Sequence, residues 1–334
     1  MSMVRAVVLK RAPTATPVAE DFEVVERAAP TALSGQLLVR SLYQSLDPYV
    51  GSRLRGRHMG EPAPAPGDSL PGFSVGEVLA SGDPAFAVGD RVVGEMGWTE
   101  VGVMASAETR RVSGDLPAAA HLGVLGMPGL TAWAGVTQLA KVGAGDIFSV
   151  DAAAGPVGGT AGQIARILGA RTVGLAGGPE KCAVLTDIYG FDAAVDYRQP
   201  DWIQTFARET APGSTVHFEN VGLSILMPAM QRLQTYGRVV LCGMAEHYHA
   251  EAPPAQMPVG MVIGKRAAML GLVVYDFYPR WSEWVELARP WIAEGKLVSV
   301  DDVSEGVESA PEQFARLMRG ENRGKALVRM SDAG

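Results

Sequence analysis

A glycine-rich turn at residues 152–159, read as AAAGPVGG, carries the most specific chemistry in the sequence. Glycines such as Gly155 and Gly158 let the backbone approach a phosphate closely. A helix that starts at Pro156 or Val157 would point its free N–H groups and positive dipole end at that anion. The turn therefore predicts a pyrophosphate site. Because the first glycine of the usual G-x-G-x-x-G pattern is an alanine here, plain packing of a strand against a helix is the alternative.

The segments around this turn have the pattern that such a site needs. An apolar run at residues 147–150 has strand length, and the residues after the turn are apolar at helical spacing. Further strands are predicted at 171–176, 193–197, 215–221, 237–243 and 267–274, alternating with helices at 180–188, 202–209, 224–233 and 280–294. Strands and helices that alternate with short connections form a parallel sheet covered by helices on both faces. The prediction is an α/β fold with a doubly wound parallel sheet of six strands.

The first 125 residues have a different character. Short β-branched or alternating runs predict strands at 4–9, 22–27, 36–45, 73–81 and 90–96. Residues 53–71 are rich in Arg, Gly and Pro and lack an apolar period, which predicts a long surface loop. A small apolar run at 121–136 predicts a helix packed between two domains. The tail from residue 298 is expected to rejoin the first domain, which gives domains of 1–124 with 299–334, and 125–298.

Composition excludes several classes of protein. The chain has 334 residues, of which 47% are hydrophobic and 19% charged, the balance of a globular protein with a substantial core. A net charge of −7 argues against a surface for nucleic acid or anionic membrane. No apolar stretch reaches the roughly 18 residues of a membrane span. We expect a cytoplasmic protein without nucleic-acid or membrane partners, in which Cys182 and Cys242 stay reduced.

The end of the second predicted strand indicates which dinucleotide fits. An NAD site places Asp or Glu there to bind the ribose 2′-hydroxyl, whereas this strand ends in two glycines, the second of them Gly178. Lys181 in the next helix, with Tyr197 and Arg198 after the third strand, can supply cations and a hydroxyl to a 2′-phosphate. These residues favour NADP over NAD. Lys181 also fits a solvated helix position, and Glu180 counts against the choice.

Short stretches spread over almost the whole chain carry a family pattern. They are LDPY at 46–49, LGMPGLTA at 125–132, AAAGPVGG at 152–159, AGGPEKC at 176–182, GFDAAVDYR at 190–198, FENVG at 218–222, CGM at 242–244 and NRGKALV at 322–328. With them the chain resembles the zinc-independent medium-chain dehydrogenases/reductases, in the alkenal/one double-bond reductase branch that includes prostaglandin reductase and curcumin reductase. The combination is specific although no single stretch is.

The resemblance implies a Rossmann domain that binds NADP(H) and a mostly-β, GroES-like catalytic domain. It implies that Lys181 and Tyr197 hold the 2′-phosphate and that Asn322 closes over the cofactor. It also implies that Asn220 and the backbone of Cys242 and Gly243 line the nicotinamide side, and that residues 272–274 make main-chain contacts to the nicotinamide carboxamide. The expected cofactor-binding set is Gly155, Pro156, Val157, Gly158, Gly178, Lys181, Tyr197, Asn220, Cys242, Gly243, Tyr248, Leu272, Val274 and Asn322.

Zinc enzymes of the same superfamily use a cysteine and a Gly-His-Glu segment near residue 73. This chain reads PGFS at 71–74 and has no cysteine before Cys182, so we expect no metal site. The clustered His247 and His249 fit a solvent-exposed polar loop. The implied chemistry is transfer of a hydride from NADPH to the β-carbon of an α,β-unsaturated aldehyde or ketone, with hydrogen-bond donation to the carbonyl oxygen.

A tyrosine hydroxyl suits that donation because it is protonated at neutral pH. Tyr248, which follows the fifth predicted strand, is the first candidate, and the resemblance suggests that it bonds to the nicotinamide ribose or the substrate carbonyl. Tyr49 is the second candidate, and a half-buried anchor is its alternative role. An aromatic group that follows the sixth strand could wall an apolar substrate pocket or form a core or dimer contact; it comprises Tyr275, Phe277, Tyr278 and Trp281.

The sequence thus predicts an NADP-dependent oxidoreductase that acts on a CH–CH group of a small-molecule enone or enal. Reduction of quinones by NADPH would use the same hydride and is the nearest alternative. A protein that binds NADPH without turnover is the alternative of another class. Superfamily members often pair their sixth strands edge to edge, so a homodimer through residues 267–274 is expected.

Overall fold

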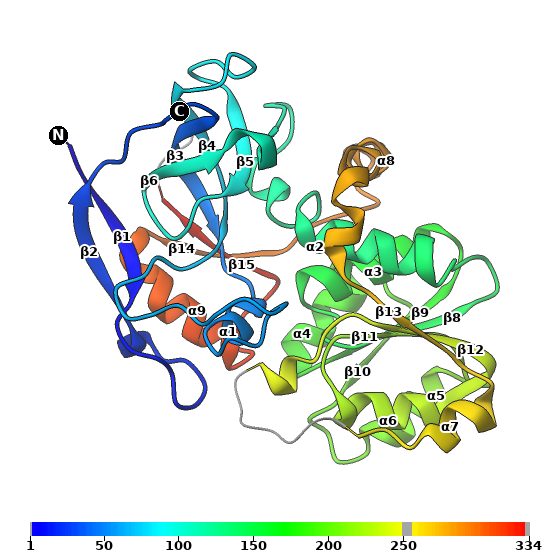
Figure 1. Cartoon of the computed structure of the whole chain (residues 1–334). Helices are drawn as coiled ribbons and strands as arrows, with labels where there is room; N and C mark the ends of the chain where they lie inside the picture. The colour runs from blue at the N-terminus through cyan, green and yellow to red at the C-terminus, as the bar shows by residue number, and fades with distance from the viewer. Residues whose placement is uncertain (1, 249–255, 331–334) are drawn as a thin grey trace. The chain divides into compact units, whose positions relative to one another are not determined.

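The computed structural model describes residues 2–248 and 256–330. Two compact units make up the chain (Figure 1). The first unit comprises Met1–Leu122, Tyr248–Glu251 and Asp301–Gly334, and the second comprises Gly123–His247 and Ala252–Val300. Among the helices of the described residues, none is long and apolar enough to cross a membrane.

The first unit is built on a mainly antiparallel sheet. Its strands are β1 (Met3–Leu9), β2 (Phe22–Ala28), β3 (Gln36–Ser45), β4 (Phe73–Ser81), β5 (Arg91–Glu95), β6 (Val101–Ala105), β7 (Arg110–Arg111), β14 (Asp301–Glu305) and β15 (Lys325–Arg329). Seven of them form one sheet, in the order β14-β15-β3-β4-β5-β7 with β6 also paired to β3, and β1 pairs with β2. The long strand β3 alternates buried and less buried residues, as a strand with one face on a core should.

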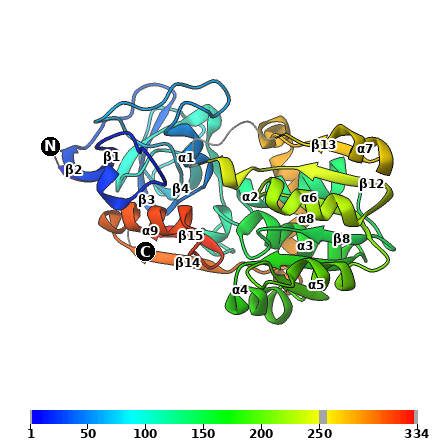
Figure 2. The ribbon, with the colours of Figure 1, turned by 90° about the horizontal axis from the view of Figure 1, so that it is seen from below.

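The C-terminal tail completes the core of this unit. Helix α9 (Ala310–Met318) lies beside β14 and β15 (Figure 2). Its Phe314 packs edge-on against Phe22 and Trp98, with ring centroids 5.8 Å and 5.2 Å apart. Chain segments from both ends of the sequence therefore share one apolar core.

The second unit holds a six-stranded sheet in which all neighbouring strands are parallel. Its strands are β8 (Ile147–Val150), β9 (Arg171–Ala176), β10 (Ala193–Asp196), β11 (Ser214–Glu219), β12 (Leu233–Leu241) and β13 (Ala268–Gly271). Their spatial order is β10-β9-β8-β11-β12-β13. The chain thus winds outward from β8 in one direction and from β11 in the other, which confirms the predicted doubly wound fold.

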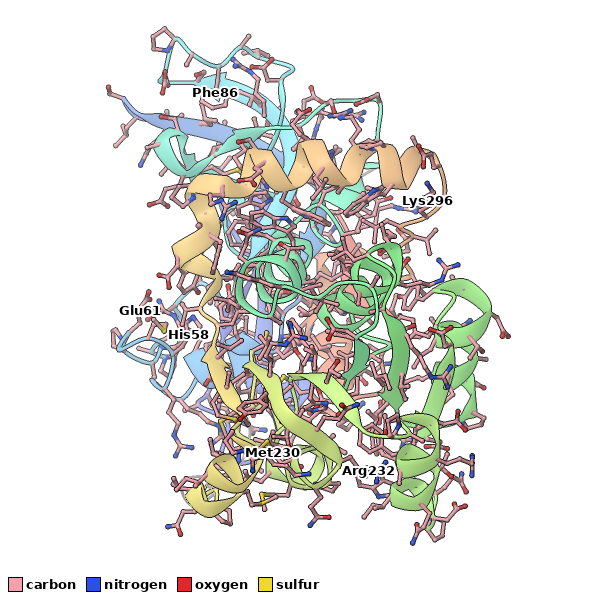
Figure 3. The ribbon with its side chains drawn as sticks, turned by 90° about the vertical axis from the view of Figure 1, so that its right-hand side faces the viewer. His58, Glu61, Phe86, Met230, Arg232 and Lys296 are labelled. Atoms are coloured by element: carbon pink, nitrogen blue, oxygen red, sulfur yellow. The ribbon has the colours of Figure 1, made fainter. Side chains whose placement is uncertain are left out.

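Helices cover both faces of this sheet. They are α2 (Met127–Trp133), α3 (Pro156–Ile167), α4 (Pro179–Ala183), α5 (Trp202–Glu209), α6 (Leu223–Arg232), α7 (Val259–Lys265) and α8 (Trp281–Ala293). Figure 1 shows α3 on one face and α5 and α6 on the other. On α6, labelled in Figure 3 by Met230 and Arg232, the Met230 side chain is buried against β12 and α7.

Several predicted bounds differ from the structure. The sixth strand ends at Gly271, not at residue 274, because a 3-10 helix, η7 (Val274–Arg280), turns the chain out of the sheet. The helix predicted at 121–136 begins only at Met127, after Gly126, and continues in a π-helical turn to Leu139. Helix α4 likewise passes into a π-helical turn at Val184. An apolar run does not mark the residue at which a strand or a helix begins or ends, so the sequence could not predict these bounds.

The predicted loop at 53–71 is a loop in the structure. It follows a short helix, α1 (Tyr49–Arg53), and its pairing consists of isolated bridges between His58 and Glu61 and between Val8 and Ser69. Figure 3 labels His58 and Glu61 in this loop. Tyr49 opens α1, and its ring lies 4.9 Å from that of His58. The loop therefore contacts Tyr49, one of the two predicted catalytic tyrosines, through His58.

Candidate functional site

The two halves of the parallel sheet meet between β8 and β11, which pair directly at Phe148 and Val216. In a doubly wound sheet, ligands bind outside the carboxyl ends of the strands at such a point. The segments that leave those ends are the glycine-rich turn after β8 and residues 220–222 after β11. Topology therefore brings two of the predicted motifs together.

The glycine-rich turn has the tight geometry that a pyrophosphate needs. Helix α3 begins at Pro156 directly after Gly155, at the helix position where a proline costs no hydrogen bond. A Cβ on Gly158 would lie 2.7 Å from the carbonyl oxygen of Ala152, closer than side chains come. The first N–H groups of a helix lack partners within it, so those near Val157 and Gly158 are suited to an anion.

The same segment also packs α3 against its neighbours. A Cβ on Gly159 would lie 2.6 Å from the ring of Tyr189, and one on Gly162 would overlap the ring of Phe191. The two interpretations of the glycines, phosphate approach and helix packing, therefore apply to different residues of one stretch.

Gly177 and Gly178, here called the glycine corner, follow β9. Gly178 has a φ of +97°, a conformation that favours glycine. A Cβ on Gly177 would lie 2.6 Å from the hydroxyl oxygen of Tyr197 and 2.9 Å from Nε of Arg198. A hydroxyl and a guanidinium thus meet at the corner where a 2′-phosphate is expected. Lys181 is half-buried on α4.

Asp196, at the end of β10, fixes this corner and was missed in the sequence. Its Oδ1 accepts hydrogen bonds from the backbone N–H of Gly178 at 2.8 Å and of Arg198 at 3.0 Å. Burial alone would raise the pKa of Asp196, but the hydrogen bonds from Gln199 and these N–H groups lower it below its ordinary value. The carboxylate is therefore engaged by the backbone. An aspartate just before the Tyr-Arg pair was the available signal.

Asn220, Cys242 and Gly243, three predicted nicotinamide contacts, lie together. The N–H groups of Cys242 and Gly243 both donate to the carbonyl oxygen of Glu219, at 3.0 and 3.1 Å. The backbone N–H of Asn220 donates to Oδ1 of Asp151 at 2.7 Å, and its Nδ2 donates to the same oxygen at 3.1 Å. The ends of β8, β11 and β12 are thus joined by hydrogen bonds.

A group of three buried titratable side chains adjoins these contacts, and sequence reasoning missed it. The buried acid cluster, as we call it, consists of Asp151, His217 and Glu219. Burial and the neighbouring Glu219 raise the pKa of Asp151 well above its ordinary value, and burial lowers the pKa of His217. Burial, followed by the charges of Asp151 and Glu219, raises the pKa of Cys242 to about 12. The Cys242 thiol is therefore no nucleophile at neutral pH.

Both predicted catalytic tyrosines belong to the first unit. Tyr49 and Tyr248 are partly buried against the core cluster that contains Val50 and Leu54. Burial, followed by the positive charge of Arg53, lowers the pKa of His58 beside Tyr49. The half-buried ring of Tyr49 agrees with both of its proposed roles.

The remaining predicted residues occupy separate places. Tyr275, Phe277 and Tyr278 lie on η7, where Tyr275 is 38% exposed and meets Tyr278 edge to face at 5.3 Å. Phe277 lies edge-on to Trp133. The N–H of Leu272 donates to the carbonyl oxygen of Leu241, so a main-chain contact from Leu272 to a ligand would use its carbonyl group. Tyr275 is thus the most accessible ring of the predicted pocket.

Val274, the other predicted main-chain contact, is the first residue of η7. Asn322, in the first unit, donates from Nδ2 to the carbonyl oxygen of Gly324. His247 ends a 3-10 turn, and His249 lies outside the described residues.

Comparisons with known proteins give a consistent result. Residues 5–112 match the family model described as the N-terminal domain of oxidoreductase, and residues 156–294 match the model described as zinc-binding dehydrogenase. The chain is 36% identical to 2-alkenal reductase (NADP(+)-dependent) of Nicotiana tabacum, over 98% of this chain and 97% of the relative. It is 35% identical to NADPH-dependent curcumin reductase of Escherichia coli, over 97% and 96%.

A solved structure extends the comparison to three dimensions. CurA from Vibrio vulnificus in complex with NADPH matches with a TM-score of 0.92 and 34% identity, over 98% of this chain and all of the other. Both units of the present chain are therefore covered by one relative.

Proposed function

Since this chain belongs to the zinc-independent enone-reductase branch of the medium-chain dehydrogenases/reductases, we propose that it reduces the carbon–carbon double bond of α,β-unsaturated aldehydes and ketones with NADPH. Within this family, the second unit is the Rossmann domain and the first is the GroES-like domain. The single observation that carries the choice of cofactor is the glycine corner, at which the hydroxyl of Tyr197 and the guanidinium of Arg198 meet.

The predicted cofactor-binding residues divide among the parts of the cofactor. The start of α3, from Gly155 to Gly158, binds the pyrophosphate through backbone N–H groups. Tyr197, Arg198 and Lys181 bind the 2′-phosphate. Asn220 with the backbone of Cys242 and Gly243 contacts the nicotinamide, and Leu272, Val274 and Asn322 supply further contacts. When bound, NADPH supplies the hydride that adds to the substrate.

The chain's own part in the reaction is to orient the substrate and stabilise charge. We assign to Tyr248 a hydrogen bond to the carbonyl oxygen, where negative charge collects as the β-carbon gains a hydride. Tyr49 is the second hydroxyl for this role. The rings of Tyr275, Phe277 and Tyr278 form an apolar wall of the substrate pocket.

The test is to follow NADPH absorbance with a panel of enals, enones and quinones, repeated with NADH. We expect oxidation of NADPH with the enals and enones. Faster turnover of quinones would replace the proposal with quinone reduction. Binding of NADPH without oxidation across the panel would indicate a non-catalytic NADPH-binding protein.

We also propose a homodimer that pairs β13 with its copy. β13 is the last strand in the order of the sheet, and its Ala268 and Gly271 are exposed. Val259 and Ile263 on the adjacent α7 are 66% and 70% exposed, which would leave apolar side chains in water in a monomer. Light scattering after gel filtration should give twice the chain mass, and Leu270→Pro should reduce it to the monomer mass.

A cytoplasmic location completes the proposal. Cys182 and Cys242 are both free thiols, as is usual in a reducing compartment. Fractionation of cells that express the natural protein should place it with cytoplasmic markers.

A further inference from the structure

The function proposed above assigns no role to the buried acid cluster. Asp151 and His217 are 0% exposed and Glu219 is 1% exposed. One polar atom from each lies within 4.8 Å of the others. Two ionised carboxylates at that separation, without solvent, would repel each other strongly. The cluster must therefore contain a proton that reduces its charge, or a cation.

An ionised Glu219 and a neutral imidazole satisfy the hydrogen bonds around Glu219 and His217. Oε1 of Glu219 accepts from the N–H groups of Val221 at 2.7 Å and Gly222 at 2.6 Å. Oε2 of Glu219 lies 3.1 Å from Nε2 of His217, and Nδ1 of His217 lies 3.0 Å from the hydroxyl of Ser149. An imidazole protonated on Nε2 donates to Glu219 and accepts from Ser149, so every group has a partner.

Asp151 is the group that lacks a donor. Its Oδ1 accepts from Asn220, but its buried Oδ2 has no donor among the described residues. The carboxyl group of Glu219 lies nearby, since one oxygen of each carboxyl group and one ring nitrogen of His217 are all within 4.8 Å of one another. Two carboxyl groups can hydrogen-bond to each other only through a proton. A proton on Asp151 makes Oδ2 a donor and satisfies the whole cluster without a cation.

We propose that Asp151 and Glu219 share one proton at neutral pH, and that the neutral Asp151 is a positioning residue that holds Asn220 toward the nicotinamide. Oδ1 of Asp151 accepts a hydrogen bond from the backbone N–H of Asn220 and one from its Nδ2, and the backbone carbonyl oxygen of Asp151 accepts a second one from Nδ2. The role of Asn220 rests on the proposed function. The shared proton does not, so the two can fail separately.

Infrared spectroscopy tests the proton without any activity. The full-length protein at neutral pH should show the carbonyl stretch of a protonated carboxylic acid, and Asp151→Asn should lack it. A spectrum without this band in the unchanged protein would overturn the shared proton. Metal analysis of the same sample should find no stoichiometric ion. One bound cation per chain would overturn the proposal in favour of a metal site.

The pH dependence of unfolding gives a second test with a defined sign. Above about pH 4, an unfolded aspartate releases its proton, whereas the folded pair keeps it, so rising pH favours unfolding. An asparagine at position 151 does not titrate. The melting temperature of Asp151→Asn should therefore rise relative to that of the unchanged protein as the pH increases from about 7 to about 8. A constant difference would show that the pair is ionised in the folded state.

Other groups that face the pair do not imitate this effect. Burial lowers the pKa of His217 and raises the pKa values of Cys242 and Tyr197, so all three are neutral from about pH 7 to pH 8. Glu246 is a further titratable group that acts on Glu219. Glu246→Gln should leave the slope of the comparison in place.

Steady-state kinetics tests the positioning of Asn220. Asp151→Ala removes the Oδ1 acceptor and leaves Asn220 only the backbone carbonyl oxygen at position 151. It should lower kcat at least tenfold while the dissociation constant of NADPH changes less than threefold. Asp151→Asn keeps an oxygen for Asn220 and a donor for Glu219, and should recover most of the lost kcat. Ser149→Ala is the matched control, because Ser149 is equally buried on β8 but contacts His217 and not Asn220.

The kinetic outcomes separate a positioning role from a structural one. If Ser149→Ala lowers kcat as much as Asp151→Ala, Asp151 acts only through stability and the positioning role is wrong. Should Asp151→Ala fail to fold, the kcat of Asp151→Asn decides, because a loss as large as tenfold would contradict a neutral acid at that position.

Discussion

At the scale of single residues, the glycine corner concentrates the choice between NADPH and NADH in a few side chains. Because Gly177 has no side chain, it leaves a space next to the hydroxyl of Tyr197 and the guanidinium of Arg198. Asp196 holds the backbone of Gly178 and Arg198 in place. Cofactor preference can therefore be changed by substitutions that leave the sheet intact.

Removal of either cation near the corner should weaken NADPH selectively. Lys181→Ala and Arg198→Ala each remove a charged donor to the 2′-phosphate, worth about 1.5–3 kcal/mol, so the KM for NADPH should rise about tenfold or more. The KM for NADH should change less than twofold. Arg208→Ala, on the exposed surface of α5, is the control. An equal loss with both cofactors would show that the residue does not contact the phosphate.

Tyr248→Phe should lower kcat because it removes the proposed donor to the carbonyl oxygen. Loss of one such donor costs about 10²-fold in turnover, with the fold unchanged. Tyr236→Phe is the matched control, since Tyr236 is 73% exposed. Rates measured with a saturating enone decide the question, and an unchanged kcat would remove Tyr248 from the mechanism. Tyr49→Phe would then be the next variant to test.

At the scale of elements, the start of α3 depends on a close approach of two backbone segments that only a glycine at position 158 allows. The turn before it includes Ala152 at a φ of +43°, and a Cβ at Gly158 would meet the Ala152 carbonyl. The turn, the N-terminus of α3 and the end of β8 therefore form one rigid piece. A change in any part should alter the geometry of the N–H groups offered to a pyrophosphate.

Gly158→Ala should weaken NADPH binding by about tenfold or more, because the turn must move by several tenths of an ångström to admit the Cβ. Fluorescence titration measures the affinity, and thermal unfolding reports any change in stability. Gly260→Ala is the control, since a Cβ there meets open space on α7. If Gly158→Ala binds NADPH normally, the start of α3 is not the pyrophosphate site.

At the scale of the whole molecule, one buried ion pair joins the two ends of the chain within the first unit. Nζ of Lys325 donates to Oδ1 of Asp47 and to the carbonyl oxygen of Leu46, both at 2.8 Å. Lys325 is only 1% exposed. The pair ties β15 of the C-terminal tail to the segment that precedes Tyr49.

Lys325→Met should destabilise the protein by about 3–5 kcal/mol, because it leaves Asp47 buried without its partner. The free energy of unfolding in urea measures this loss. Adding Asp47→Asn to the same variant removes the unpaired charge and should recover a large part of the stability. If the double variant is no more stable than the single one, the lost packing of the lysine side chain is the cause instead.

Local patterns in the sequence determined much of this protein. Alternation of apolar runs with helical segments gave the parallel sheet, because each strand and helix shows its buried face in its own residues. The glycines of the turn and of the glycine corner could be identified for a similar reason. A position that requires glycine is marked by that residue alone, without reference to distant parts of the chain. The preference for NADP followed from Gly178, Lys181, Tyr197 and Arg198 within two neighbouring stretches.

Only the tertiary structure decided which distant polar groups meet. Asp151 and Glu219 lie far apart in the chain, and only the parallel pairing of β8 with β11 brings their carboxyl groups within 4.8 Å of each other. The same holds for Lys325 with Asp47, and for Asp196 with the N–H of Gly178. The end of β13 at Gly271 was also beyond the sequence, because an apolar run does not encode where its neighbour stops pairing. A buried charged group can be identified only when its partner is known, and the fold determines which groups become partners.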